Sequence, residues 1–142
     1  MTDRSMSLRI VTAVLVALLG STAACSGDSA LDTAGDPVVF GEGERPPAIP
    51  GDFPIPGNAV IGSTMIDRTN HRTEMALQVG SDLEATVQYF NVGLVSQGYV
   101  VGASHGTATS WTISFSRGEL NGEIDFTAAG DATQVLVSVN EI

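Results

Sequence analysis

The chain has 142 residues, a length typical of one domain, and a formal net charge of −10 from sixteen acidic residues against six arginines. This acidic balance repels phosphate backbones and excludes nucleic acid as a partner. The single cysteine, Cys25, excludes an internal disulfide and a cysteine-based zinc site, and no residue pattern indicates a metal or a cofactor.

The first 24 residues have the organisation of an export signal. Met1–Arg9 carries two arginines, and Ile10–Leu19 is apolar except for Thr12. A charged start, an apolar stretch and a small-residue exit are typical of a signal peptide, which we predict over residues 1–24. The apolar stretch is too short for a membrane span, which requires about 20 apolar residues.

The residues Thr22, Ala23, Ala24 and Cys25 resemble the lipobox of bacterial lipoproteins. The resemblance implies a diacylglyceryl group on the Cys25 thiol, cleavage between Ala24 and Cys25, and attachment to the extracytoplasmic face of the cell membrane. Two acyl chains hold a protein stably, whereas one chain holds it only marginally. Thr22 stands where the family usually has Leu, Val or Ile; the alternative is an ordinary signal peptide cut at the same place. In its absence of lysine, the composition of the chain resembles that of exported actinobacterial proteins.

Residues 25–56 differ in composition from the rest of the chain. All six prolines lie between Pro37 and Pro56, together with several acidic residues, and apolar residues recur there with no period. Such a segment buries too little apolar surface to offset the entropy lost on ordering. We therefore predict a disordered, lipid-anchored tether over residues 25–56 and one domain over residues 57–142.

Alternating apolar and polar residues predict six strands in this domain. In Thr73–Val79, for example, Met75, Leu77 and Val79 share one face. The segment "DRTNHR" is rich in turn residues and predicts a hairpin between the first two strands. The predicted strands are Ala59–Ile66, Thr73–Val79, Tyr99–Ala103, Thr109–Ser116, Leu120–Ala128 and Gln134–Glu141.

One helix is predicted between the second and third strands, from Asp82 to Gln97. Ser81 and Glu84 are spaced as a capping box at its start, and Gly98 is placed to provide a left-handed C-terminal cap. Apolar residues at 4-3-4 spacing define one buried face. These residues are Leu83, Val87, Phe90 and Leu94.

The element order ββαββββ predicts an α+β fold. Consecutive short strands pair best as antiparallel neighbours, so we expect an antiparallel sheet with the helix packed on one face, a two-layer sandwich. The other face carries Ser, Thr, Gln and acidic residues and can meet water. Two segments, Pro54–Ala59 and Leu94–Tyr99, resemble small exported bacterial domains; this likeness concerns the fold and implies no activity.

Three basic residues, Arg68, His71 and Arg72, gather in the predicted hairpin turn of an otherwise acidic chain. This cluster indicates a contact with an anionic group, and a solvated turn is the simpler alternative. His71 and the other histidine, His105, lack the neighbours that a catalytic or metal site requires.

Two carboxylate residues, Glu123 and Asp125, lie on the same face of one predicted strand, with their β-carbons about 7 Å apart. Carboxylates at such a separation can hydrolyse glycosides. The simpler interpretation is a charged outer face that discourages aggregation. The aromatic residues are interpreted as core, because four of the five lie on predicted inward faces. They are Phe90, Tyr99, Trp111, Phe115 and Phe126.

The sequence contains no nucleophile motif or phosphate loop and gives no indication of an enzyme. We expect a membrane-anchored surface lipoprotein that presents a small binding domain to an envelope protein or a wall polymer. One alternative is a carrier or sensor that holds a hydrophobic ligand between helix and sheet. A second is a cell-wall hydrolase that uses Glu123 and Asp125.

Overall fold

Residues 35–142 are described by the computed structural model; the predicted signal peptide, its cleavage site and Cys25 lie outside the described residues. Seven strands and one helix follow one another along this part of the chain. They are β1 Val38–Glu42, β2 Ala59–Asp67, β3 Arg72–Val79, α1 Leu83–Ser96, β4 Val100–Gly106, β5 Ser110–Arg117, β6 Leu120–Ala129 and β7 Ala132–Glu141.

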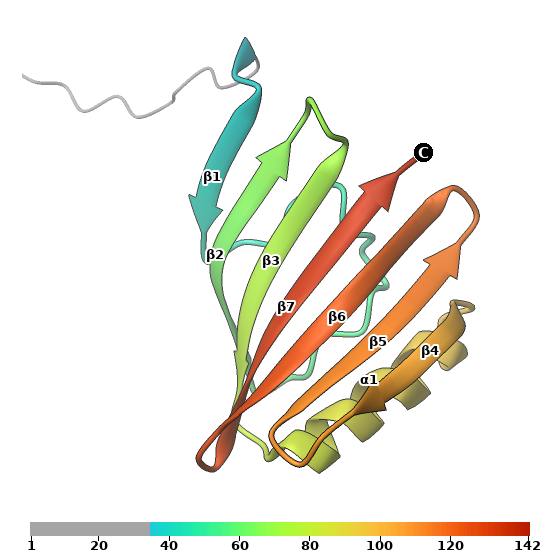
Figure 1. Ribbon diagram of the computed structural model, residues 1–142. Coiled ribbons are helices and arrows are strands. Elements are labelled where there is room, and N and C mark those ends of the chain that lie inside the picture. Colours follow the sequence, from blue (N-terminus) through green and yellow to red (C-terminus); the bar gives the residue numbers. More distant parts are fainter. Residues whose placement is uncertain (1–34) are drawn as a thin grey trace, which may run out of the picture. The chain divides into compact units, whose positions relative to one another are not determined.

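All seven strands form one antiparallel sheet in the order β1-β2-β3-β7-β6-β5-β4 (Figure 1). The predicted α+β class and the antiparallel sheet with one helix are therefore confirmed. The last strand of the chain, β7, lies in the middle of the sheet and pairs with β3 on one side and with β6 on the other. This places β1 and β4 at the two edges.

The predicted helix Asp82–Gln97 extends one residue beyond α1 at each end; the predicted Gly98 cap is confirmed and the predicted N-cap is corrected. The N-cap is Asp82, whose Oδ1 accepts a hydrogen bond of 2.8 Å from the Ala85 N–H, and not Ser81. At the other end Gly98 has a φ of 80°, and Tyr99 N–H donates to the Leu94 carbonyl at 2.9 Å. This is the left-handed cap that glycine adopts without a steric cost.

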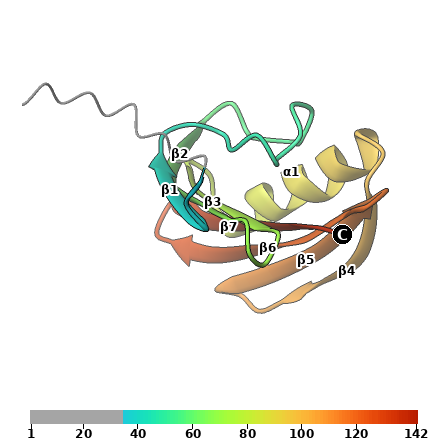
Figure 2. The same ribbon diagram turned by 90° about the horizontal axis from the view of Figure 1, so that it is seen from above.

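The helix covers only part of the sheet. It packs against β4, β5, β6 and β7, which form one half of the seven-stranded sheet. The remaining part of the same face is covered by residues 43–58, which we call the strap (Figure 2). The strap buries Ile49 and Phe53 in the core, with exposed fractions of 2% and 3%.

This coverage corrects the predicted tether. Residues 38–42 form β1, which pairs with β2, and the strap packs on the sheet with buried side chains at Pro46, Pro54 and Pro56. The predicted disorder is therefore wrong for this part of residues 25–56, and β1 precedes the predicted ββαββββ order. The described residues belong to one compact unit with its own hydrophobic core, the property that allows a domain to fold alone.

The interior is built from inward residues of both layers. The aromatic rings of Phe53, Phe90, Phe115 and Phe126 and of Tyr99 pack in a continuous group, with neighbouring centroids 5.4 to 6.3 Å apart. Such tilted and edge-on ring pairs stabilise a core beyond the area they bury. The interpretation of the aromatic residues as core is confirmed, except that Trp111 is only half-buried.

Candidate functional site

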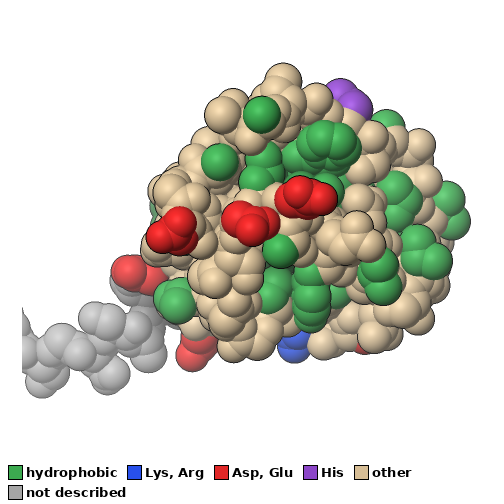
Figure 3. All heavy atoms as spheres, turned by 90° about the horizontal axis from the view of Figure 1, so that it is seen from below, with side chains coloured by type: hydrophobic (Ala, Val, Ile, Leu, Met, Phe, Trp, Pro, Cys, Tyr) green, Lys and Arg blue, Asp and Glu red, His purple; other side chains and the backbone are tan. Residues whose placement is uncertain are grey.

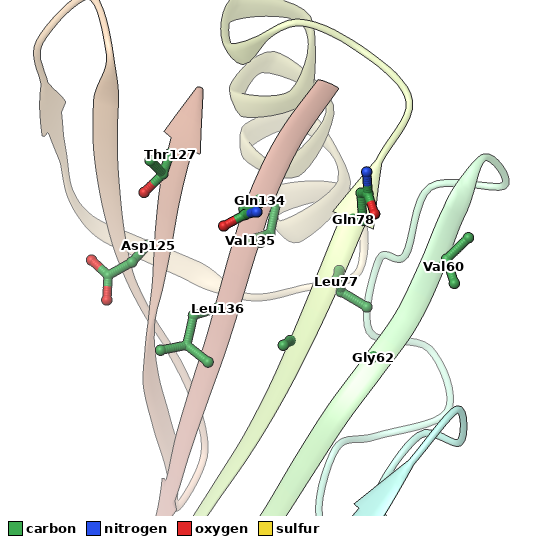
Figure 4. Close-up of a pocket in the computed structure, with 10 residues that line it drawn as sticks. Val60, Gly62, Leu77, Gln78, Asp125, Thr127, Gln134, Val135 and Leu136 are labelled. Carbon is green, nitrogen blue, oxygen red and sulfur yellow. The ribbon is translucent and has the colours of Figure 1, made fainter. Parts of the chain in front are cut away.

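The face of the sheet opposite α1 and the strap, which we call the open face, is not covered by any other element of the described residues. A shallow groove of about 490 Å³ crosses its centre, over β2, β3, β7 and β6 (Figure 4). The side chains that shape it are Val60, Ala76, Gln78, Gln134, Leu136 and Asp125.

The groove results from small side chains on the central strands. Ala76 lies on β3 directly opposite Leu136 of β7, and Gly62 of β2 has no side chain at all. The register between β2 and β3 shifts between Ile61 and Thr64, a bulge that interrupts the regular pairing beside the groove. Ala76 and Gly62 therefore form a low, apolar floor, and the side chains of Leu136 and Val60 project beyond it.

The polar groups of the groove are mostly uncharged. Gln78 and Gln134 are direct cross-strand partners, so two amide-bearing side chains project from neighbouring strands at one end of the groove. Each amide both donates and accepts hydrogen bonds. Asp125 is the only charged residue that lines the groove, and its Oδ1 accepts a hydrogen bond of 2.8 Å from the Thr112 hydroxyl. The arrangement suits a neutral ligand with hydroxyl or amide groups.

The structure places Glu123 and Asp125 on the same strand face, as predicted. Glu123 is exposed to solvent and lies opposite Ser138, while Asp125 borders the groove. Glycoside hydrolysis requires one carboxyl that an apolar environment keeps protonated. On this face Asp125 lies beside Thr112 and Thr127 and directly opposite Leu136 of β7, so its surroundings are polar on one side and apolar on the other.

The turn between β2 and β3 brings Arg68, His71 and Arg72 together, as the predicted hairpin requires. Asp67 holds this turn: its Oδ1 accepts from the Thr69 and Asn70 N–H groups at 3.0 and 3.1 Å. Hydrogen bonds from Asn70 also lower the pKa of the Asp67 carboxyl. The turn is thus an ordered structure in which His71 adopts a left-handed φ of 52°.

Both arginines of this turn have partners within the chain. Arg68 Nη1 donates to the Asp36 carbonyl at 2.6 Å, which ties the turn to the residues before β1. Arg72 forms an ion pair with Glu74. An anion at this turn would share these two side chains with their internal partners, and the anion contact stays a prediction.

A second groove, of about 560 Å³, opens at the end of the molecule where the first turns of α1 face the β4–β5 turn. Leu83, Val87 and Trp111 provide its apolar surface, and Trp111 Nε1 donates to Ser104 Oγ at 2.9 Å. Figure 3 shows this end of the molecule, where exposed apolar side chains lie among acidic ones. We call it the end groove.

Neither histidine lies in a catalytic arrangement. His105 is exposed on the edge strand β4, opposite Thr112. Within residues 35–142, no cluster of His, Cys, Asp and Glu side chains is suitable for a metal ion. The same residues contain no helix with the length and hydropathy that a membrane crossing needs.

Sequence reasoning missed the groove on the open face. The alternation in β3 and β7 does place Ala76 and Leu136 outward, but only the pairing of β3 with β7 makes them neighbours. Comparison of the chain with protein-family models, with curated proteins and with solved structures gave no match. The candidate site therefore depends on its own geometry.

Proposed function

We propose that the chain is a lipoprotein anchored through Cys25 at the extracytoplasmic face of the cell membrane, and that its domain binds an envelope component through the groove on the open face. The observation that carries the proposal is the uncovered sheet face, in which an apolar floor lies beside the amides of Gln78 and Gln134. Apolar contact combined with a few oriented hydrogen-bonding groups is the usual composition of a binding site.

The position of β1 limits how far an anchored domain can lie from the membrane. The 13 peptide units between Cys25 and Val38 span at most about 45 Å when fully extended. The predicted tether of residues 25–56 would have allowed more than twice this distance. An envelope partner must therefore lie close to the membrane surface.

The anchor is tested by mass spectrometry of the mature N-terminus and by detergent-phase partitioning. We expect a diacylglyceryl group on Cys25, and we expect Cys25→Ala to move the protein to the aqueous phase. A mature chain that begins at Cys25 with a free thiol would overturn lipid attachment and leave the binding proposal standing.

The groove is tested by two substitutions on one face of β7. Leu136→Arg places a guanidinium beside the groove floor, while Asn140→Arg introduces the same charge on the same strand face, away from the residues that line the groove. Binding of the purified domain to isolated envelopes of the source cells is measured by cosedimentation. We expect Leu136→Arg to weaken binding by about tenfold or more and Asn140→Arg to leave it unchanged within about twofold. Equal effects would overturn the groove as the binding site.

A second candidate function rests on the end groove. Its apolar lining by Leu83, Val87 and Trp111 favours a hydrophobic ligand held at the mouth between helix and sheet. Trp111 is the only tryptophan of the chain, so its fluorescence reports on this groove alone. A mass excess in native mass spectrometry of domain purified without detergent, with a blue shift of Trp111 emission on adding a fatty acid, would support this function. A bare mass and unchanged emission would contradict it.

A further inference from the structure

One continuous part of this acidic chain carries no charged side chain. From Ala85 to Ser116 there is no Asp, Glu, Lys or Arg, whereas the described residues outside this range hold thirteen acidic residues and four arginines. The uncharged stretch includes α1 from its third residue onward, all of β4 and all of β5 except Arg117. The side of the molecule that these elements form is therefore neutral except at its end, where Glu84 lies beside Thr107 and Ala108 of the β4–β5 turn, in a domain whose formal charge is −9.

The strand at this neutral side, β4, is an edge of the sheet. Every residue of β4 except Val101 is exposed. The Thr107 N–H donates to the Ser110 carbonyl at 2.7 Å and closes the β4–β5 hairpin. In an antiparallel ladder, hydrogen-bonded pairs alternate with pairs whose backbone groups point away from the partner strand. Counted from the hydrogen-bonded pair of Thr107 and Ser110, Gly106 and Ser104 belong to the second kind, so their N–H and C=O groups point away from β5. These groups are available to another strand.

The usual protection of an edge strand is nearly absent from β4. Native edges carry charged side chains, proline or bulges that prevent pairing with another molecule. β4 has neither charge nor proline, and its only irregularity is the register shift between Val101 and Ala103. The other edge, β1, differs: Glu42 lies within it, and Asp36 and Glu44 flank it.

We propose that two copies of this chain associate through their β4 strands, which pair antiparallel about a two-fold axis near Ala103 and join the two sheets into one. Two domains of the same negative charge approach most easily where neither carries a charge, and the neutral side is such a place. A basic partner would find no acidic complement on it. A two-fold contact uses the same patch on both copies, as the exposed edge allows.

The helix contributes to the same side. α1 packs against β4 and runs along it in Figure 1, and on the flank where Asn91 contacts Ser104 of β4 it leaves Val95 exposed, at 62%. A stable interface buries at least about 1,000 Å² in total, more than a pair of short strands provides alone. The apolar residues of the two helices supply further area next to the joined strands.

The test uses the domain from Asp32 to Ile142, which contains no cysteine. Sedimentation velocity over a range of concentrations should show a monomer–dimer equilibrium. Ala103→Lys places two ammonium groups close together at the axis, and we expect it to raise the dissociation constant by about tenfold or more. Because this substitution makes each domain less negative, weaker association cannot come from general repulsion.

The control is Phe40→Lys on the β1 edge, where the side chain is 76% exposed. It introduces the same charge change, and we expect the dissociation constant to stay unchanged. In a second measurement, Ala103→Cys should form disulfide-linked dimers under mild oxidation, whereas Phe40→Cys should not. Thermal unfolding checks that each variant is folded. A monomer at all concentrations, or a dimer that Phe40→Lys disrupts and Ala103→Lys does not, would overturn the proposal.

Discussion

Arg117 and Asp52, which lie 65 residues apart in the sequence, form a two-pronged ion pair with distances of 2.7 Å from Nη1 to Oδ2 and 2.9 Å from Nη2 to Oδ1. Arg117 Nη1 also donates to the Gln97 carbonyl at 3.0 Å, and the guanidinium lies 4.1 Å from the centroid of the Tyr99 ring. One side chain of β5 thus joins the strap, the end of α1 and the residue that precedes β4.

This ion pair predicts how stability depends on pH. The hydrogen bond from Arg117 lowers the pKa of the Asp52 carboxyl from its ordinary value of 3.8. A lowered folded-state pKa contributes stability that is present above the ordinary value and is lost as the pH falls through the lowered one. We expect Asp52→Asn to remove part of the acid-induced fall in the free energy of unfolding. Urea denaturation of both proteins between about pH 2 and 7 measures this; parallel curves would contradict it.

From Tyr99 we expect stability to depend on pH in the opposite direction, with a loss at alkaline pH. Its side chain is buried, the hydroxyl has no hydrogen-bond partner among residues 35–142, and burial raises the pKa of the phenol above its ordinary value of 10.0. A raised pKa gives stability that is present below pH 10 and is lost as the pH rises through the raised value.

We expect Tyr99→Phe to reduce this alkaline loss. At pH 7 the substitution should be neutral or stabilising by up to about 1 kcal/mol, because it removes an unsatisfied buried hydroxyl and keeps the ring. Thermal unfolding at pH 7 and chemical denaturation above pH 10 give the two values. A destabilisation of about 2 kcal/mol or more at pH 7 would mean that the hydroxyl has a partner in solution.

The regular elements could be predicted because their patterns are local. The alternation of Met75, Leu77 and Val79 and the 4-3-4 spacing on α1 each indicate an element without knowledge of its neighbours. The N-cap was predicted one residue early because Ser81 and Asp82 are both good caps. In the structure the Ser81 hydroxyl instead accepts a hydrogen bond of 3.0 Å from Asn58 in the strap.

The strap and the groove could not be predicted, because each depends on contacts between distant residues. Ile49 and Phe53 anchor the strap through two side chains in a proline-rich segment, which leaves no periodic signal. The groove requires β7 to insert between β3 and β6, and no local pattern states which strands become neighbours. The preference for pairing of consecutive strands indicates the hairpins only.

Two phenylalanines in the segment predicted as a tether provide a matched test of the strap. Phe53 is 3% exposed and contacts the rings of Phe90, Tyr99 and Phe115, whereas Phe40 on β1 is 76% exposed. We expect Phe53→Ala to lower the free energy of unfolding by about 3–5 kcal/mol, the cost of a cavity in an aromatic core.

Phe40→Ala is the control and should change the free energy of unfolding by no more than about 0.5 kcal/mol. Urea denaturation at neutral pH measures both variants. If Phe53→Ala were as mild as Phe40→Ala, the strap would not be part of the cooperative unit, and residues 43–58 would behave as the sequence analysis predicted.

Gly122 provides a last test, since it makes room for an aromatic ring. It lies on β6 directly opposite Phe115 of β5, and a Cβ added to it would lie 2.6 Å from Phe115 Cζ and 2.4 Å from the Ser138 carbonyl oxygen. Both distances are shorter than atoms tolerate, so Gly122→Ala must displace the ring or the strand. We expect it to lower the free energy of unfolding by about 1–3 kcal/mol. Gly57→Ala, where no atom of the described residues lies within 4 Å of the added Cβ, should be neutral or stabilising by up to about 1 kcal/mol. Equal effects of the two substitutions on the urea midpoint would show that Phe115 does not pack over Gly122.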